Sequence, residues 1–366
     1  MRKIVTSESV GAGHPDKTCD IIADAFLDEA LRSDPSAQMA VECAIKNDKL
    51  FIYGESTTSA TIDYDTIAKK VLHYLGYDET KFTIIKEISE QSVEINHATI
   101  SDTIKANDQG IVYGYACNET KEYMPLPIMI AHKLMQKYEE LRLNNNMFFS
   151  DAKSQVSIEY EDDKPVSIHT ILMSVSHSEN ISHNDIESII KNEVINVVLE
   201  EYKDYVLQDT RFIINPSGKF TIWGSFGDSG CVGRKIVVDT YGGVGRVGGG
   251  CFSSKNSTKV DRSGAYFARF VAKDIVALGL ADKCEIQLSF GIGLERPISI
   301  YIDTFGTEKK PLDYIYNFVD TNYDFRVGSM IKELGLNAPI YSKTACFGHF
   351  GRAEFPWEKQ KSKYIL

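Results

Sequence analysis

Apolar side chains recur every three or four residues over Asp16–Arg32, which is the pattern of an amphipathic helix. Pro15 and Asp16 suit its first turn, because proline has no N–H to leave unbonded and a carboxylate faces the positive end of the helix dipole. Two runs of strand character follow, at Gln38–Lys46 and Leu50–Thr57, and the polar residues between them are typical of a hairpin turn. The sequence therefore predicts a helix followed by a hairpin.

The same order of elements recurs twice more along the chain. A second helix, predicted over Tyr64–Leu75 with Gly76 as a left-handed cap, completes the first unit. Hairpins mixed with helices favour an α+β fold over a doubly wound parallel sheet, with three related units at intervals of roughly 110–140 residues. The later units are predicted to contain the helices Pro127–Leu141, Asp185–Tyr202 and Ser263–Leu278 and the strands Ser154–Tyr160, Val166–Val175, Glu285–Phe290 and Pro297–Ile302.

Two stretches follow neither the helical nor the strand period. Gln91–Gly110 is polar and rich in turn residues, which predicts a mobile loop. Gly224–Ser254 holds ten of the 26 glycines. Glycine at this density forms either a set of tight turns or a loop whose backbone N–H groups approach a ligand. On the glycines alone, the turns are the favoured interpretation.

Composition limits the class of protein. A length of 366 residues suggests two or three domains of ~150 residues. Seven scattered cysteines without a C-x-x-C pair favour free thiols in a reducing compartment and give no zinc spacing. The N-terminus has no apolar stretch typical of a signal peptide, and no apolar run approaches the ~18 residues of a membrane-spanning helix. We therefore expect a cytoplasmic protein without a membrane partner.

The charge is distributed unevenly. A net charge of −11 argues against a nucleic-acid or anionic-membrane partner, since both require a positive field. Residues 231–270 nevertheless carry seven cations against two anions, a net +5, which leaves −16 for the rest of the chain. Cations, backbone donors and a few carboxylates together suit a polyphosphate with Mg²⁺. The alternative is a solvated basic face, which the interleaved glycines and apolar residues disfavour.

Local motifs narrow the chemistry. The nearest approach to a P-loop has Ser254 in place of the second glycine and Asn256 in place of Ser or Thr, which rejects a P-loop NTPase. His14 and Asp16 stand at a predicted helix start, a natural anion site, although such a histidine is more often a cap. Lys153 lies in a third polar cluster, where a lone lysine is usually solvated.

Nine strings, in fixed order from one end of the chain to the other, resemble those of the S-adenosylmethionine synthetases (methionine adenosyltransferases). Neither chance nor a shared fold reproduces such a set, so the resemblance is specific and covers essentially the whole chain. The strings are TSESVGAGHPDK at 6–17, GESTTSA at 54–60, YGYACNET at 113–120, DAKSQV at 151–156, FIINPSGKF at 212–220, GDSGCVGRK at 227–235, VDTYGG at 238–243, KVDRSGAY at 259–266 and GHFGR at 348–352.

Two of the family's motifs are altered. GAGDQG reads KANDQG at 105–110, and HGGGAFSGKD reads VGGGCFSSKN at 247–256. The loop between Gln91 and Asp108 is also shorter than is usual in the family. Lost glycines and a lost acid change loop geometry near the phosphates. Every cation and carboxylate given a role below is retained, so the resemblance still implies the activity.

The resemblance implies that ATP and L-methionine give S-adenosylmethionine through attack of the methionine sulfur on ribose C5′. Tripolyphosphate leaves and is then hydrolysed to phosphate and pyrophosphate. A thioether is a weak nucleophile, so the leaving group must be stabilised and the reactants held in line. The implied catalytic residues at the leaving oxygen are His14 and Lys153, and those on the triphosphate are Arg234 and Lys235, together with Lys255 and Lys259. The implied contacts to the rest of ATP are Phe220 and Asp228. The implied contacts to methionine are Glu55, Gln91, Asp108, Asp228 and Lys259.

The resemblance also implies cofactors, fold and assembly. Asp16 and Asp261 resemble ligands of Mg²⁺, with two ions per active site, and Glu42 resembles a ligand of K⁺. The loop from Gln91 to Asp108 resembles a gate that closes over the substrates. The implied fold has three similar βαβ-rich subdomains around a pseudo-threefold axis, and the implied assembly is a homodimer with shared active sites, paired into a homotetramer in some members. The subdomain regions are 1–100, 105–221 and 222–366, interleaved in space.

Two other functions stay open at this stage. An ATP-dependent kinase or ligase using the same basic, glycine-rich site would leave ADP or AMP. A non-catalytic nucleotide-binding or regulatory subunit would be consistent with the altered glycine loops. The joint presence of His14, Lys153, Asp16 and Asp261 disfavours the second, since a pure binder has no need of all four.

Overall fold

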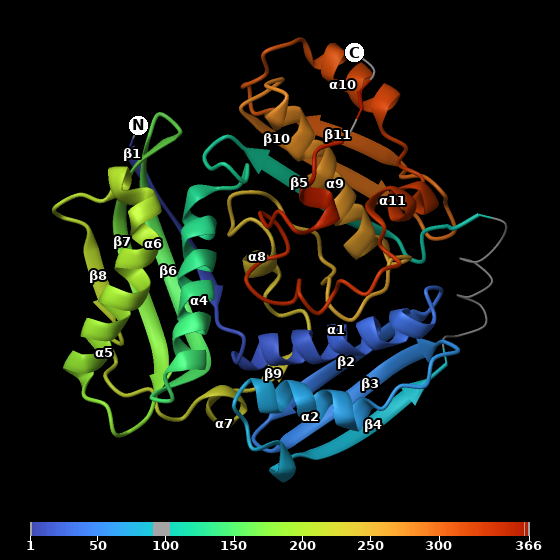
Figure 1. Cartoon of the computed structure of the whole chain (residues 1–366). Helices are drawn as coiled ribbons and strands as arrows, with labels where there is room; N and C mark the ends of the chain where they lie inside the picture. The colour runs from blue at the N-terminus through green and yellow to red at the C-terminus, as the bar shows by residue number, and fades with distance from the viewer. Residues whose placement is uncertain (1, 91–102, 362, 365–366) are drawn as a thin grey trace.

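The computed structural model describes residues 2–90, 103–361 and 363–364. Figure 1 shows three lobes, each a sheet with helices packed on it, around a centre crossed by the segment that holds α8 (Ile236–Asp239). The architecture therefore has three domains of mixed α and β content.

The first lobe is built on a hairpin of alternating burial. In β2 (Gln38–Lys46) every second residue is buried, so one face of the strand enters the core. β2 pairs antiparallel with β3 (Lys49–Thr57) through a two-residue turn, in which Asn47 has a φ of 50°. The four-stranded sheet is completed by β4 (Thr83–Ser89), parallel to β3, and by β9 (Gly230–Cys231), antiparallel to β2. Helix α1 (Pro15–Ser33) packs on β2, and α2 (Tyr64–Tyr74) packs beside α1.

The second lobe repeats this plan with longer strands. β6 (Phe148–Glu161) and β7 (Lys164–His177) form a hairpin whose turn residues Asp162 and Asp163 have φ values of 48° and 62°, as a type I′ turn requires. The sheet order is β1-β6-β7-β8, with β1 (Arg2–Val10) antiparallel to β6 and β8 (Arg211–Ile214) parallel to β7. Helix α4 (Leu126–Asn144) packs on both β6 and β1.

The helix predicted over residues 185–202 is not one regular helix. It is divided into α5 (His183–Ile189), the π-helix η2 (Ile190–Ile195), α6 (Asn196–Leu199) and the 3₁₀ segment η3 (Glu200–Tyr205). The π turn holds three buried side chains, Ile190, Val194 and Ile195. Periodicity detects the apolar stripe but not this change of hydrogen bonding.

The third lobe has a three-stranded sheet in the order β11-β10-β5. Its hairpin strands β10 (Lys283–Phe290) and β11 (Ser299–Asp303) follow the long helix α9 (Val260–Ala277), and β5 (Gly110–Cys117) pairs antiparallel with β10. Helix α9 packs on β5 and β10. The remaining elements are η1 (Glu79–Lys81), α7 (Gly224–Gly227), α10 (Leu312–Asn322), α11 (Val327–Leu334) and η4 (Pro356–Glu358).

Each lobe takes one outer strand from a different part of the chain. β1 pairs with the hairpin of the central region, β5 from the central region pairs with the C-terminal hairpin, and β9 from the C-terminal region pairs with the first hairpin. The exchange is therefore cyclic. The predicted threefold repeat of helix and hairpin is present, with a long helix before each hairpin. β1, β4, β5, β8 and β9 were not predicted.

Most of the predicted elements are confirmed to within a few residues. Gly76 has the predicted left-handed conformation, with a φ of 87°, and its N–H donates to the carbonyl of His73. The glycine-rich stretch contains only very short elements. All seven cysteines are free. Residues 91–102, which contain most of the predicted loop, lie outside the described residues.

Gly114 marks the closest approach of β5 to α9. A Cβ atom added at this position would lie 2.0 Å from the carbonyl carbon of Ala268. We expect Gly114→Ala to lower the free energy of unfolding by about 1–3 kcal/mol, because backbone of α9 cannot rotate away as a side chain can. Urea denaturation checks this. Gly249→Ala, where nothing lies within 4 Å of the added atom, is the control; an equal effect of both would contradict the prediction.

Candidate active site

The start of α1 lies directly against β6. The N–H groups of Gly11 and Gly13 donate to the carbonyls of Ala152 and Ser150, at 2.8 and 3.0 Å. Gly13 has no room for a side chain, since an added Cβ would lie 1.9 Å from Ser150 Oγ. The turn therefore seats His14 beside the segment that carries Lys153.

His14 caps α1 and is neutral. Its Nδ1 accepts the N–H of Asp16 at 3.2 Å, so the ring proton lies on Nε2. The side chain is buried, and burial lowers the pKa of His14 to about 3, with a further contribution from Lys235. Lys153 also acts on this pKa, so the two residues predicted at the leaving oxygen share one electrostatic environment. His14 thus offers an N–H donor, not a cation.

Asp16 forms ion pairs with two of the cations that are predicted to bind phosphate. Lys235 Nζ lies 2.7 Å from Asp16 Oδ2, and an Arg234 guanidinium nitrogen lies 3.5 Å from Oδ1. The N–H of Cys231 also donates to Oδ1, at 3.0 Å. Burial would raise the pKa of Asp16, but the hydrogen bonds from Lys235 and Cys231 and the charge of Lys235 lower it below its ordinary value. The carboxylate is therefore ionised.

A second group of charges surrounds the start of α9. Lys255 Nζ lies 2.5 Å from Asp261 Oδ2. Burial lowers the pKa of Lys259, while Glu55 and Asp108 act to raise it. The predicted methionine contacts Glu55, Asp108 and Lys259 thus lie near one another, although they come from three distant segments. Gln91, the other predicted contact, lies outside the described residues.

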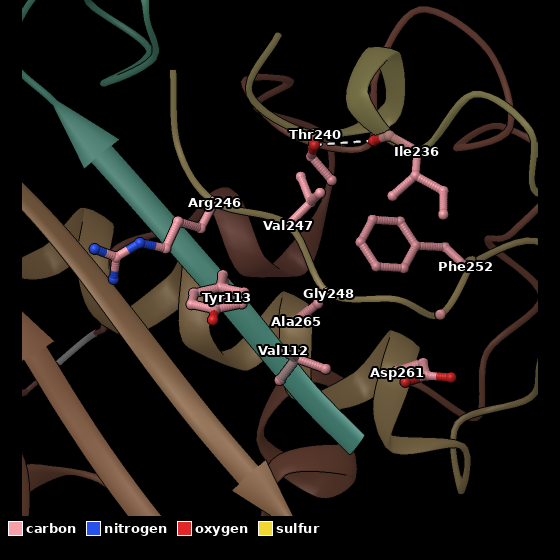
Figure 2. Close-up of a pocket in the computed structure, with 11 residues that line it drawn as sticks. Val112, Tyr113, Ile236, Thr240, Arg246, Val247, Gly248, Phe252, Asp261 and Ala265 are labelled. Carbon is pink, nitrogen blue, oxygen red and sulfur yellow. Dashed lines mark hydrogen bonds between the residues drawn. The ribbon is translucent and has the colours of Figure 1, made fainter. Parts of the chain in front are cut away.

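A pocket between β5, α8, residues 246–250 of the glycine-rich stretch and α9 shows how Asp261 is placed (Figure 2). Gly250 leaves the space that the Asp261 carboxylate fills, since an added Cβ would lie 2.0 Å from its Oδ2. Figure 2 shows Arg246 directed away from the other lining residues. Its guanidinium lies 3.1 Å from a carboxylate oxygen of Glu285. Arg246 therefore pairs with a residue of the β10 strand and does not point into the pocket.

The basic tract divides into two sets of residues. Arg262 and Arg269 are fully buried and paired with Asp24 and Glu358, at 2.7 and 2.9 Å. With Arg246, they account for three of the seven cations counted in the sequence. The net charge of the tract therefore overstates the positive charge that is available to a ligand. The other set comprises the four cations that are predicted to bind the triphosphate, Arg234, Lys235, Lys255 and Lys259.

The remaining predicted contacts, Glu42, Asp228 and Phe220, have other neighbours. Glu42 stands opposite Tyr53 in the β2–β3 register, and the Tyr53 hydroxyl lies 3.7 Å from Cys231 Sγ. Burial raises the pKa of Tyr53, with contributions from Cys231 and Glu42. Asp228 follows α7 and acts on the pKa of His14. The N–H of Phe220 donates to His177 Nε2 at 3.1 Å.

Asp151 is a buried carboxyl to which the sequence reasoning gave no role. Its Oδ2 accepts the N–H of Gly224 at 2.8 Å, while Oδ1 has no hydrogen-bond partner among the described residues. Burial raises the pKa of Asp151 to about 6, against the N–H of Gly224 and the charge of Lys153. Its place two residues before Lys153 in the DAKSQV string was the available signal.

The described residues contain no cluster of three or more His, Cys, Asp or Glu side chains placed to hold a metal ion. Mg²⁺ commonly binds one or two carboxylates together with substrate phosphates. Asp16 and Asp261 supply carboxylates of that kind. In the part of the chain that the structure covers, no helix combines the length and apolar character needed to cross a membrane.

Sequence comparison bears on the whole chain. Residues 2–100, 103–220 and 222–359 match the N-terminal, central and C-terminal domains of S-adenosylmethionine synthetase. The S-adenosylmethionine synthase of Oenococcus oeni is 48% identical over 388 residues, covering 100% of both chains. That of Mesoplasma florum is 46% identical, covering 98% of both, and that of Clostridium botulinum is 44% identical, covering 98% of this chain and 97% of its own. Together with the order of the nine strings, these matches show that the chain belongs to the S-adenosylmethionine synthetase family.

Proposed function

We propose that this site transfers the adenosyl group of ATP to the sulfur of L-methionine and then hydrolyses the tripolyphosphate that leaves. The observation that carries the proposal is that four cations stand at two helix starts: Arg234 and Lys235 lie beside Asp16 at the start of α1, and Lys255 and Lys259 lie at the start of α9 beside Asp261. His14 and Lys153 belong to the first of these groups. The activity itself follows from membership of the family and from relatives at 44–48% identity.

The residues would divide the reaction between them. The four cations bind the triphosphate and disperse the charge that develops as it leaves. His14 donates its Nε2–H to the leaving oxygen, and Lys153 neutralises the same atom. Glu55, Asp108 and Lys259 suit the charged ends of methionine, because they present carboxylates and an ammonium near one another. Asp228 is proposed as a further methionine contact. Phe220 and Asp228 contact the nucleoside. Gln91 remains a predicted methionine contact.

Magnesium and potassium are part of the proposal. Asp16 and Asp261 fit Mg²⁺, because their oxygens are hard donors and the lowered pKa of Asp16 keeps that carboxylate ionised. Glu42 fits K⁺ in the same way. Bound Mg²⁺, two ions per site in the proposal, would neutralise charge on the phosphates. Lys235 and Lys255, now paired with Asp16 and Asp261, would then be available to phosphate oxygens.

The finer features of fold and assembly belong to the proposal too. The cyclic exchange of β1, β5 and β9 supports a pseudo-threefold axis relating three βαβ-rich subdomains, with regions 1–100, 105–221 and 222–366 interleaved. We further propose a homodimer with shared active sites, which pairs into a homotetramer in some members of the family, and a cytoplasmic location. The segment from Gln91 to Asp108 is proposed to close over the substrates.

Product analysis tests the function. We expect ATP, L-methionine, Mg²⁺ and K⁺ to give S-adenosylmethionine, phosphate and pyrophosphate in equal amounts, measured by mass spectrometry. Chelation of Mg²⁺ with EDTA should abolish the reaction, since the phosphate charge is then left without its main counterion. ADP or AMP without S-adenosylmethionine would identify a kinase or ligase instead. Binding of ATP without any turnover would identify a nucleotide-binding subunit.

A further inference from the structure

Helix α1 carries a carboxylate at every fourth position, Asp16, Asp20, Asp24 and Asp28. Residues four apart lie on one face of a helix, so the four form a row along it. All are buried, with exposed fractions of 0–2%. Buried carboxylates are costly unless they are paired, and here each accepts backbone N–H groups from a loop far away in the sequence.

The first two carboxylates of the row hold the loop of Arg234 and Lys235. Cys231 donates its N–H to Asp16 at 3.0 Å, and Gly233 donates its N–H to Asp20 at 2.9 Å. Gly233, with a φ of 78°, directly precedes Arg234. The other oxygen of Asp20 accepts from Lys17 Nζ at 2.8 Å. Asp20 thus fixes the backbone one residue before the two cations, without touching either.

The third carboxylate acts in the same way on Lys255. Ser254 donates its N–H to Asp24 at 3.0 Å. Arg262, which binds Asp24 through two hydrogen bonds of 2.7 and 2.8 Å, also donates to the carbonyl of Lys255 at 3.1 Å. The backbone on both sides of Lys255 is therefore held. The fourth carboxylate, Asp28, instead accepts the N–H groups of Tyr341 and Ser342, both at 2.8 Å.

We propose that Asp20 and Asp24 are positioning residues: Asp20 sets where Arg234 and Lys235 stand, and Asp24 sets where Lys255 stands, for binding triphosphate. Helix α1, which starts after the His14 cap, thereby fixes the spacing between the leaving-oxygen donor and the loop of Arg234 and Lys235. Reactions that depend on alignment are sensitive to such spacing, and a shift of ~1 Å can cost ~100-fold in rate. This inference rests on the proposed triphosphate role of the cations.

Two variants of Asp20 separate its contact with the Gly233 N–H from its contact with Lys17. Asp20→Ala removes the acceptor for the Gly233 N–H. Asp20→Asn keeps an amide oxygen there but places an uncharged NH2 group opposite Lys17, so it loses the ion pair and the hydrogen bond with Lys17. We expect Asp20→Ala to lower kcat/KM for hydrolysis of added tripolyphosphate by about 10-fold or more, and Asp20→Asn to restore it to within about 3-fold. Both variants lose stability through Lys17, so the melting temperature does not follow the activity.

Asp28 provides the matched control. Asp28→Ala removes the same kind of acceptor from the same helix face, but the segment that it releases carries none of the four cations. It should lower the melting temperature and leave hydrolysis within about 2-fold of the unaltered protein, well below that temperature. In combination with Lys235→Met, Asp20→Ala should be non-additive in kcat/KM and Asp28→Ala additive.

Distinct results would overturn the inference and the proposed function. If the unaltered protein forms S-adenosylmethionine but Asp20→Ala and Asp28→Ala have equal effects on hydrolysis, the positioning role is wrong. An Asp20→Asn variant that loses as much activity as Asp20→Ala would place the role in the ion pair with Lys17 instead. If Asp20→Ala does not fold, Asp20→Asn alone decides, because positioning requires that it keeps hydrolysis while losing stability. Failure of the unaltered protein to form S-adenosylmethionine would count against the proposed function.

Discussion

The variants His14→Asn and Lys153→Met are each expected to form S-adenosylmethionine at least about 100-fold more slowly than the unaltered protein, a loss of roughly 2.7 kcal/mol of transition-state stabilisation. The triphosphate carries its developing charge on the oxygen that leaves C5′, and both variants remove a group placed beside it. Steady-state formation of S-adenosylmethionine at saturating ATP and methionine measures the effect.

His14→Asn is a sharp test, because it separates catalysis from folding. An asparagine side chain also caps helices well, so its oxygen can accept the Asp16 N–H that His14 Nδ1 now accepts. The start of α1 should therefore persist, with a melting temperature close to that of the unaltered protein, while the Nε2–H donor is lost. The exposed residues His183 and Lys164 provide matched controls, as His183→Asn and Lys164→Met. Turnover of His14→Asn within about 3-fold of the controls would refute the role.

The second large effect is on stability. Glu358 is buried in η4 and accepts from Arg269 Nε and Nη2, from Lys273 Nζ and from the N–H of Gly351, at 3.0, 2.9, 3.0 and 2.8 Å. Glu358→Gln keeps the shape but removes the charge and one of the two acceptor oxygens, which leaves the buried Arg269 cation without its carboxylate partner. We expect a loss of about 3–5 kcal/mol in the free energy of unfolding, measured by urea denaturation.

The stability difference should also depend on pH. Burial would raise the pKa of Glu358, but Arg269 and Lys273 lower it below its ordinary value of 4.5. A carboxyl whose pKa is lowered by folding stabilises the protein above its unfolded pKa and ceases to do so as pH falls through the folded pKa. The advantage of the unaltered protein over Glu358→Gln should thus be complete near neutrality and should shrink below about pH 4.5.

Glu354→Gln is the control for Glu358. Glu354 lies four residues earlier and pairs with Arg352 at 2.8 Å, but its side chain is half exposed. Exposed pairs contribute under about 1 kcal/mol, so its loss should be small at every pH. A difference of less than about 1 kcal/mol between the two variants would show that the buried group is not needed for stability.

Periodicity predicted the elements whose burial is decided locally. α1 and α9 are buried over most of their length and carry apolar side chains at helical spacing, and the turn at Asp162 and Asp163 joins neighbouring strands, so each leaves its pattern in a short stretch of sequence. The exchanged strand β9 has only two residues, and β1 alternates burial only near its end. Their partners lie far away in the sequence, and no local pattern encodes such a pairing.

The candidate site divides in a similar way. His14, Lys153 and the four phosphate-facing cations came from a specific set of strings, and the structure brings several of them into one electrostatic environment. The charge count failed for Arg262 and Arg269, because a sum of charges cannot distinguish a cation that faces solvent from one bound to a buried carboxylate. The row of aspartates on α1 was visible as a spacing of four, but only the fold shows which N–H groups it binds.

The exchange of strands also sets an order of events during synthesis. Val10 pairs with Lys153, so at ~5–20 residues per second β1 waits roughly 7–30 s for its partner to leave the ribosome. β2 waits longer still for β9, which arrives only with residue 230. No lobe can therefore complete its sheet from its own stretch of nascent chain. The unpaired edges of β1 and β2 are the surfaces that a chaperone would have to protect until residues 161 and 231, respectively, have been synthesised.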